Sequence, residues 1–193
     1  MKAFSYLATV ALVGAFLFLA AGQPATSSLA AATSPSPMTG QQAACTAEEH
    51  RQFDFWLGEW TVTRTADGQL AGTSKISSAF AGCVLVEEYS SPSGYAGSSF
   101  NIYDAAQEVW HQTWVDNSGL LLELDGMLEN GKMVLMGERP GPDDAMQLHQ
   151  ITWEAMDDGT VRQVWTTSDD QGVTWNAAFD GTYTKKAAVG QGG

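Results

Sequence analysis

The sequence predicts an all-β protein, a ten-stranded up-and-down antiparallel barrel with a short N-terminal capping helix. Short β-type runs follow one another from residue 59 to residue 186, with turn signals roughly every 8–12 residues. Asn130-Gly131 is a strong hairpin signal, because both residues tolerate positive φ. No segment after residue 58 has convincing helical periodicity, and connections this short favour up-and-down neighbours. The expected strands are residues 59–66, 69–81, 83–90, 95–103, 108–116, 119–128, 132–139, 145–155, 160–168 and 173–185.

Ten consecutive strands of this kind close most economically into a barrel, because closure removes the unpaired edges. A barrel of that size has an interior wide enough to hold a small ligand. A sandwich of two sheets is the alternative architecture, since the same strand pattern is typical of it.

Four aromatic residues lie within the eight positions of Phe53-Asp54-Phe55-Trp56-Leu57-Gly58-Glu59-Trp60. Residues 46–57 are expected to form a short helix, with Thr46 as N-cap and two glutamates in the first turn. Gly58 ends this helix, and the first strand follows at once. A helix with large aromatic side chains that leads directly into a sheet is suited to close one end of a barrel.

The first 44 residues have the composition of an export signal followed by a spacer. Lys2 precedes an apolar stretch and then small residues, which is the layout of a secretory signal peptide. The stretch is shorter than the roughly 20 residues of a membrane span. We expect residues 1–22 to be removed, with Ala25 and Ala32 as alternative cleavage positions, which leaves no membrane anchor. Residues 23–44 are expected to be a disordered linker. The domain then comprises residues 45–186, with a flexible tail at 187–193, in a periplasmic or secreted protein.

The chain contains two cysteines, Cys45 and Cys83. In an oxidising compartment such a pair is most simply a disulfide, here between the expected helix and the end of the second strand. Neither cysteine has a second ligand at the spacing of a zinc motif, so no metal site is expected.

Acidic residues outnumber basic ones, 22 to 9, which gives a net charge of −13. Phosphate backbones and anionic lipid headgroups repel such a chain, so nucleic acid is not an expected partner. Solubility is the simpler explanation of the charge.

Near the C-terminus, Ser168-Asp169-Asp170-Gln171-Gly172-Val173-Thr174-Trp175 resembles the Asp-box of sialidase-type propellers. In that motif Asp and Ser bind turn amides and Trp packs beneath. It occurs once here and no internal repeat accompanies it. We interpret it as a hairpin device with no glycosidase implication.

The run 108–116 is the most suggestive interior strand. Alternation places Trp110, Gln112, Trp114 and Asp116 on one face, so that two indoles flank an amide with an acid at the mouth. Apolar pockets with a few fixed polar groups are built in this way. The other interpretation is that these tryptophans are barrel core.

The run 160–168 repeats the pairing of tryptophan with glutamine, with Gln163 and Trp165 on one face and Arg162 on the other. The candidate ligand-binding residues are Trp56, Trp60, Trp110, Gln112, Trp114, Asp116, Arg162, Gln163 and Trp165.

The candidate catalytic residues are Glu87, Glu88 and His111, with Asp116 and Arg162 as further polar residues to test. An acid–base pair such as Glu87 with His111 could isomerise or hydrate a bound hydrophobic molecule without a cofactor. No nucleophile elbow, P-loop, dinucleotide fingerprint or zinc motif occurs in the sequence.

Four segments together carry a family resemblance: Phe53–Trp60, Gly82-Cys83, Trp110-His111-Gln112-Thr113-Trp114-Val115-Asp116 and Ser168–Trp175. On these segments, residues 45–185 resemble a family of bacterial secreted proteins catalogued as a domain of unknown function. The resemblance implies a lipocalin-like (calycin) barrel and says less about activity, since one fold hosts many functions.

More distantly, Phe55-Trp56-Leu57-Gly58-Glu59-Trp60 is similar to the opening of nitrobindins, which are ten-stranded barrels that bind haem. Nitrobindin-like proteins take the axial ligand from a histidine near the C-terminal end of the barrel. The last two expected strands carry no histidine, and the chain has only His50, His111 and His149. Haem is therefore an alternative, and no cofactor is expected.

Together these observations predict an exported β-barrel that binds a small hydrophobic molecule. The first alternative is a cofactor-free isomerase or hydratase that uses the same lumen. A barrel with a filled interior that makes only protein contacts is another.

Overall fold

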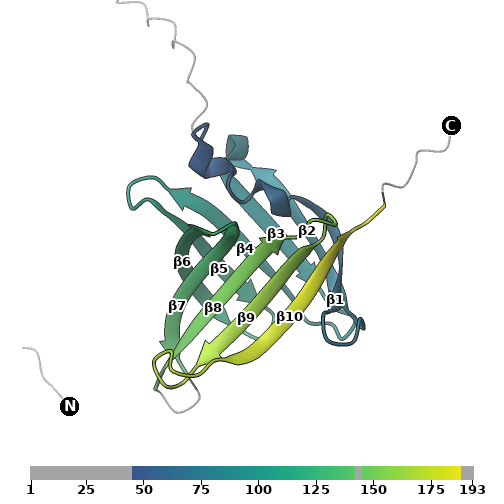
Figure 1. The fold of residues 1–193 in the computed structure, drawn as a ribbon, viewed down its shortest axis with the longest axis vertical. Coiled ribbons are helices and arrows are strands. Elements are labelled where there is room, and N and C mark those ends of the chain that lie inside the picture. Colours follow the sequence, from purple (N-terminus) through teal and green to yellow (C-terminus); the bar gives the residue numbers. More distant parts are fainter. Residues whose placement is uncertain (1–44, 142–144, 188–193) are drawn as a thin grey trace, which may run out of the picture. The chain divides into compact units, whose positions relative to one another are not determined.

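The computed structural model describes residues 45–141 and 145–187, and it contains ten strands at the positions that the sequence predicts (Figure 1). The expected signal peptide (1–22), linker (23–44) and all but the first residue of the tail (187–193) lie outside the described residues. The strands are β1 (Gly58–Arg64), β2 (Leu70–Ala79), β3 (Val84–Ser90), β4 (Ala96–Asp104), β5 (Val109–Asp116), β6 (Leu121–Glu129), β7 (Lys132–Pro140), β8 (Met146–Ala155), β9 (Val161–Ser168) and β10 (Asn176–Lys185).

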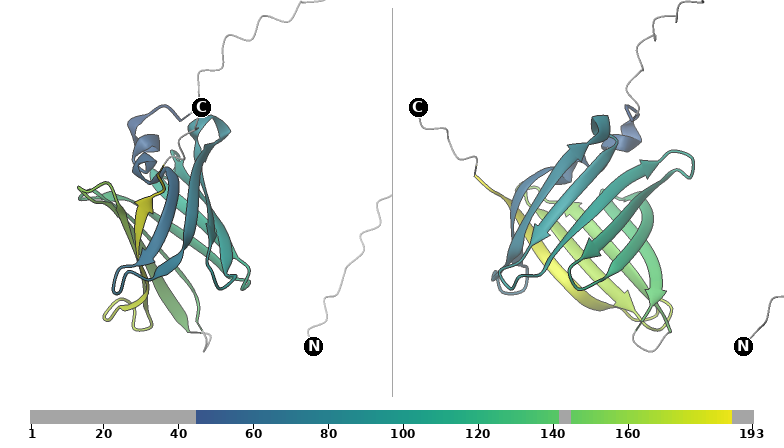
Figure 2. Two further views of the ribbon diagram at one scale, coloured as in Figure 1. Left: turned by 90° about the vertical axis from the view of Figure 1, so that its right-hand side faces the viewer. Right: turned by 180° about the vertical axis from the view of Figure 1, so that it is seen from behind.

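The strands form one closed antiparallel barrel in which every strand pairs with its neighbours in sequence (Figures 1 and 2). The closing pair is β1 with β10, in register from Trp60 opposite Lys185 to Arg64 opposite Gly181. This pairing confirms the predicted barrel and shows that the two-sheet sandwich is wrong. Short turns make consecutive strands pair, and the last strand completes the ring because no edge is then left unpaired.

The expected capping helix is present as two 3₁₀ turns, η1 (Glu48–Arg51) and η2 (Asp54–Trp56), and a third, η3 (Phe80–Gly82), joins β2 to β3. The turns lie at one end of the barrel (Figure 2). The N-cap of η1 is Ala47 and makes no side-chain bond, so the N-cap predicted for Thr46 is wrong. A 3₁₀ geometry brings side chains three positions apart onto the same side. Phe53 and Trp56 therefore point together into the barrel, with their rings stacked 5.1 Å apart.

An aromatic cluster fills the barrel next to these turns. We call it the plug, and it consists of Phe53, Trp56, Trp60, Trp110 and Trp153, which are all 0–1% exposed. The Phe53 ring contacts Trp56, Trp110 and Trp153 at centroid distances of 5.1, 5.6 and 5.1 Å. Aromatic rings bury large apolar areas and gain further stability from stacked and edge-to-face contacts such as these. The plug closes one end of the lumen.

A disulfide joins Cys45, which precedes η1, to Cys83, which precedes β3, with a Cα–Cα distance of 5.1 Å. The predicted pairing is confirmed. The bond attaches the N-terminal turns to the barrel wall, and disulfides of this kind are typical of oxidising, extracytoplasmic compartments. None of the helical turns in the described part of the chain has the length and hydrophobicity that a membrane span requires.

The Asp-box connects β9 to β10 as a hairpin. The Ser168 hydroxyl oxygen accepts from the Gly172 amide at 2.8 Å, and the Asp170 carboxylate accepts from the Thr174 amide at 2.8 Å. The Trp175 indole donates to the Gly172 carbonyl at 3.1 Å. The motif therefore satisfies turn amides, as the sequence predicts.

Candidate functional site

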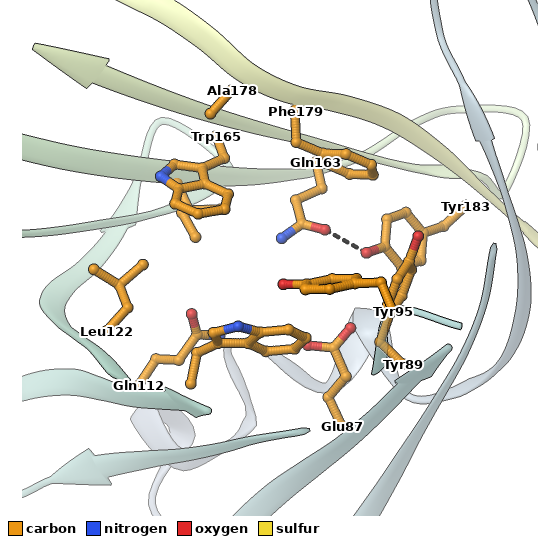
Figure 3. A pocket seen from close by; sticks show the side chains of 12 residues that line it. Glu87, Tyr89, Tyr95, Gln112, Leu122, Gln163, Trp165, Ala178, Phe179 and Tyr183 are labelled. Carbon is orange, nitrogen blue, oxygen red and sulfur yellow. Dashed lines mark hydrogen bonds between the residues drawn. The ribbon is translucent and has the colours of Figure 1, made fainter. Parts of the chain in front are cut away.

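A cavity of about 240 Å³ lies inside the barrel, beyond the plug (Figure 3). Six strands and the β3–β4 connection contribute its lining. We call the part of the lining that carries Glu87, Gln112, Gln163 and Tyr183 the floor, and the part that carries Tyr95, Trp114 and Trp165 the mouth. The lining residues are Glu87, Tyr89, Tyr95, Gln112, Trp114, Leu122, Ile151, Gln163, Trp165, Ala178, Phe179 and Tyr183.

The floor of the cavity is polar. Glu87, Gln112 and Tyr183 are only 3%, 2% and 1% exposed, and they come from β3, β5 and β10. The Tyr183 hydroxyl donates to the amide oxygen of Gln163 on β9, a bond drawn in Figure 3. These groups face a common space in that view, so a ligand that reaches the floor meets several hydrogen-bonding atoms.

Glu87 is the buried carboxyl group of this floor. Its Oε1 accepts from the Ser74 hydroxyl at 2.8 Å and its Oε2 from the Ser99 hydroxyl at 3.1 Å. Ser99 lies directly opposite Glu87 on the neighbouring strand β4. Burial raises the pKa of Glu87 to about 7, because desolvation outweighs the two serine hydrogen bonds, which lower it.

Asp116 at the end of β5 holds two aromatic rings of the mouth. Its Oδ2 accepts from the Tyr95 hydroxyl at 2.7 Å and from the Trp114 indole at 3.0 Å. Burial raises the pKa of Asp116, but hydrogen bonds from Ser118, Tyr95 and Trp114 outweigh it and lower the pKa to about 2. Asp116 is therefore a carboxylate that positions cavity residues without lining the cavity itself.

The third aromatic side chain with a fixed orientation is Trp165. Its indole donates to Nδ1 of His149, a buried histidine on β8, at 3.1 Å. Burial lowers the pKa of His149, and the positive charge of Arg139 adds to this effect. A neutral ring leaves Nδ1 free to accept, so the histidine holds the indole over the cavity.

Gly97 on β4 makes room for Trp114. A methyl group at this position would lie 2.3 Å from Cζ2 of the indole. Gly97→Ala is therefore expected to displace Trp114, weaken binding of an aromatic probe and lower stability by about 1–3 kcal/mol through overpacking. Near-ultraviolet circular dichroism and denaturant unfolding measure the two effects. Ser98→Ala, on the outer face of the same strand, is the control, and equal behaviour of the two variants would contradict the prediction.

The structure separates the predicted tryptophans into two groups. Trp114 and Trp165 line the cavity together with Gln112 and Gln163. Trp56, Trp60 and Trp110 belong to the plug and do not line it. All five tryptophans face the barrel interior. Trp56, Trp60 and Trp110 lie at the end of the barrel that the plug fills, so no cavity remains beside them.

Three predicted site residues lie on the outer face and do not reach the lumen. Glu88 is exposed, and His111 binds Asp125 at 2.8 Å and Thr113 at 2.9 Å. Arg162 forms two bonds with Asp180, at 2.7 and 3.1 Å. Because side chains alternate along a strand, Glu88 and Arg162 point away from their neighbours Glu87 and Gln163. The pairing of Glu87 with His111 as acid and base is therefore not assembled.

Several cavity residues were missed by the sequence analysis. Tyr89 follows Glu87 by two positions on β3. Because side chains alternate along a strand, this spacing indicates that Tyr89 and Glu87 point to the same face of the sheet. Leu122 lies opposite Trp114, and Ile151 lies opposite Trp165. The bulge between Ala177 and Phe179 brings Ala178 and Phe179 both to the cavity. The remaining residues that were missed are Tyr95 and Tyr183.

The haem alternative requires a histidine that faces the lumen. His111 faces outward, His149 lies behind Trp165, and His50 packs edge-on against Tyr103 at 5.1 Å. None of the three lines the cavity, so the residues present do not fit a haem with an axial histidine. Within residues 45–141 and 145–187, no group of three or more His, Cys, Asp or Glu side chains is arranged to hold a metal ion.

The site is thus a cavity with one buried carboxyl group and several aromatic residues in its lining. Hydrogen bonds to Asp116 and His149 orient the tryptophans at its mouth. Comparison of the chain with known proteins gives no match to a protein-family model and no significant similarity to a curated protein.

Proposed function

We propose that this protein is exported and binds a small, mostly apolar molecule inside its barrel. The observation that carries the proposal is the cavity of about 240 Å³ between the plug and the mouth. An apolar protein cavity of about 150 Å³ is large enough for benzene. The cavity here therefore suits a body of one or two rings, and a larger molecule would extend through the mouth.

The lining supports binding of an apolar ligand. Trp114, Trp165, Phe179, Leu122 and Ile151 supply large apolar surfaces, and the polar groups are confined to a few positions on the floor. This is the usual composition of small-molecule sites. A hollow of this volume also counts against the alternative of a barrel packed solid with side chains.

Export is supported by the residues of the N-terminus and by the Cys45–Cys83 disulfide. The resemblance of the aromatic opening and of the Trp110–Asp116 segment to exported calycin-like barrels agrees with this compartment. Of the three candidate catalytic residues only Glu87 reaches the cavity, so binding is better supported than two-residue acid–base catalysis.

Binding is tested by isothermal titration with 1-naphthalenemethanol, a neutral two-ring probe. We expect one molecule to bind per barrel and Leu122→Trp, which fills the cavity, to weaken binding on the order of tenfold or more. Leu121→Trp is the matched control, because Leu121 is 51% exposed on the outer face of the same strand.

Circular dichroism shows whether Leu122→Trp still folds. If it does not, Ala178→Phe blocks the cavity from an exposed position instead. The proposal fails if the wild-type protein binds no probe, or if variants at positions 121 and 122 bind it equally well.

A further inference from the structure

The hydrogen bonds around Glu87 have a fixed direction. The Leu85 carbonyl can only accept, so the amide of Asn101 must donate to it, at 3.2 Å. The same amide nitrogen donates to the Ser99 hydroxyl oxygen at 2.9 Å. The hydroxyl hydrogen of Ser99 is then directed to Glu87 Oε2 at 3.1 Å. The chain of donors therefore ends at the carboxyl group.

The other end of this series of hydrogen bonds, at Gln112, also has a fixed direction. Gln112 donates to Oδ1 of Asn101 at 2.7 Å, which is consistent with the amide orientation that Leu85 imposes. Ser74 supplies a second donor, to Glu87 Oε1 at 2.8 Å. Donors directed at both oxygens favour a carboxylate over a carboxylic acid. The two serines occupy two of the roughly four acceptor positions of a carboxylate, which leaves acceptor capacity for a ligand.

Within residues 45–141 and 145–187, the groups that face Glu87 include no cation. Besides Ser74 on β2 and Ser99 on β4, the titratable groups beside it are Tyr89 on its own strand and Tyr183 on β10. Lys75 on β2 is exposed and pairs in register with outward-facing Glu88. No lysine or arginine in the described part of the chain lines the cavity. A charge at Glu87 therefore has no counterion among the residues that the structure describes.

Aromatic side chains line the same cavity as Glu87. They include Tyr89, Tyr95, Trp114, Trp165 and Phe179. The faces of such rings attract cations, and the attraction increases where water is excluded. A cation in the cavity would gain both the aromatic contacts and the missing partner of the carboxylate.

We propose that the ligand is an organic amine with a one- or two-ring apolar body, and that its ammonium group binds the Glu87 carboxylate on the cavity floor. This rests on the proposed function and assigns its ligand class. The same site disfavours carboxylates such as fatty acids, because they would meet Glu87 with no basic residue to receive them. The apolar body lies against the walls, between Leu122 and the aromatic rings.

Three probes with the same naphthalene body test the ligand class. They are 1-naphthylmethylamine, a cation at neutral pH, the neutral 1-naphthalenemethanol, and the anion 1-naphthoate. At about pH 8 we expect the amine to bind on the order of tenfold or more tighter than the alcohol, and the anion to bind weakest. Isothermal titration on the disulfide-bonded protein gives the three dissociation constants.

Glu87→Gln is expected to abolish the preference for the amine over the alcohol, because it removes the carboxylate that the ammonium group pairs with. Glu88→Gln removes the neighbouring carboxylate from the outer face and is expected to keep the full preference. Lowering the pH from about 8 to about 5.5 should weaken binding of the amine and leave binding of the alcohol nearly unchanged, since the carboxylate must be ionised to pair.

The outcomes separate the two proposals. If no probe binds, the proposed function fails. If the alcohol binds and the amine binds no tighter, the proposed function stands and the assignment of an amine is overturned. It is also overturned if the preference survives in Glu87→Gln, because the cation then binds elsewhere.

Discussion

Replacing Cys45 and Cys83 together by serine is expected to lower the free energy of unfolding by about 4 kcal/mol. The two residues are 38 positions apart, and closing a loop of this length removes entropy from the unfolded chain that corresponds to about 4 kcal/mol. Both side chains are half-buried, so serine adds little desolvation cost. Guanidinium chloride unfolding, followed by tryptophan fluorescence, measures the difference.

Two comparisons identify the disulfide as the cause. Wild-type protein in a reducing agent should unfold at the same denaturant concentration as the double serine variant. The folded variant should bind 1-naphthalenemethanol as tightly as wild type, because the disulfide lies at the plugged end and contributes nothing to the cavity lining. A loss of less than about 1 kcal/mol, well below the chain-entropy value, would contradict the prediction.

The fold was predictable because it depends on local signals. Asn130-Gly131 has positive φ at both residues and connects β6 to β7 as a two-residue hairpin. Alternation on β5 correctly placed Gln112 and Trp114 toward the lumen. Alternation of side chains along a strand determines which residues face the interior, and short turns determine that consecutive strands pair. Both signals involve only residues close together in the sequence.

Depth along the barrel axis was not predictable from the same signals. Trp110 and Trp114 share a face of β5, yet Trp110 packs in the plug and Trp114 lines the cavity. Their difference depends on how far Phe53 and Trp56 reach into the lumen, which is a property of tertiary packing. The N-terminal aromatics revealed that a plug exists, but not how much of the barrel it fills.

The structure does not bring Glu87 and His111 together, for a reason already present in the sequence. If Gln112 faces the lumen, alternation puts His111 outside, and His111 is indeed on the outer face with Asp125. A lumenal Glu87 could therefore not pair with it. Ala178 and Phe179 are different, because both reach the cavity through a register shift in β10 that no alternation rule predicts.

The difference in unfolding free energy between Glu87→Gln and wild type is expected to grow by about 3 kcal/mol, in favour of the variant, as the pH rises from 4 to 8. The pKa of Glu87 rises from 4.5 in the unfolded chain to about 7 in the folded protein because the carboxyl group is buried. Each pKa unit corresponds to about 1.4 kcal/mol, so this rise corresponds to about 3 kcal/mol. Between pH 4.5 and 7 the unfolded chain releases a proton that the folded protein retains. Wild-type stability therefore falls over this window, and above it the difference from glutamine stays constant.

Urea unfolding of both proteins at several pH values measures this difference and cancels the titration of all other groups. Glu88→Gln, which removes an exposed carboxylate from the same strand, shows how much of the change comes from losing one negative charge. A stability difference that does not vary with pH would mean that Glu87 ionises as easily in the barrel as in water. If the difference does vary, the folded protein holds a carboxylate at a cost near neutral pH, and a bound ammonium group would remove that cost. Saturating 1-naphthylmethylamine should then flatten the pH dependence of wild type, whereas the neutral alcohol should leave its slope unchanged.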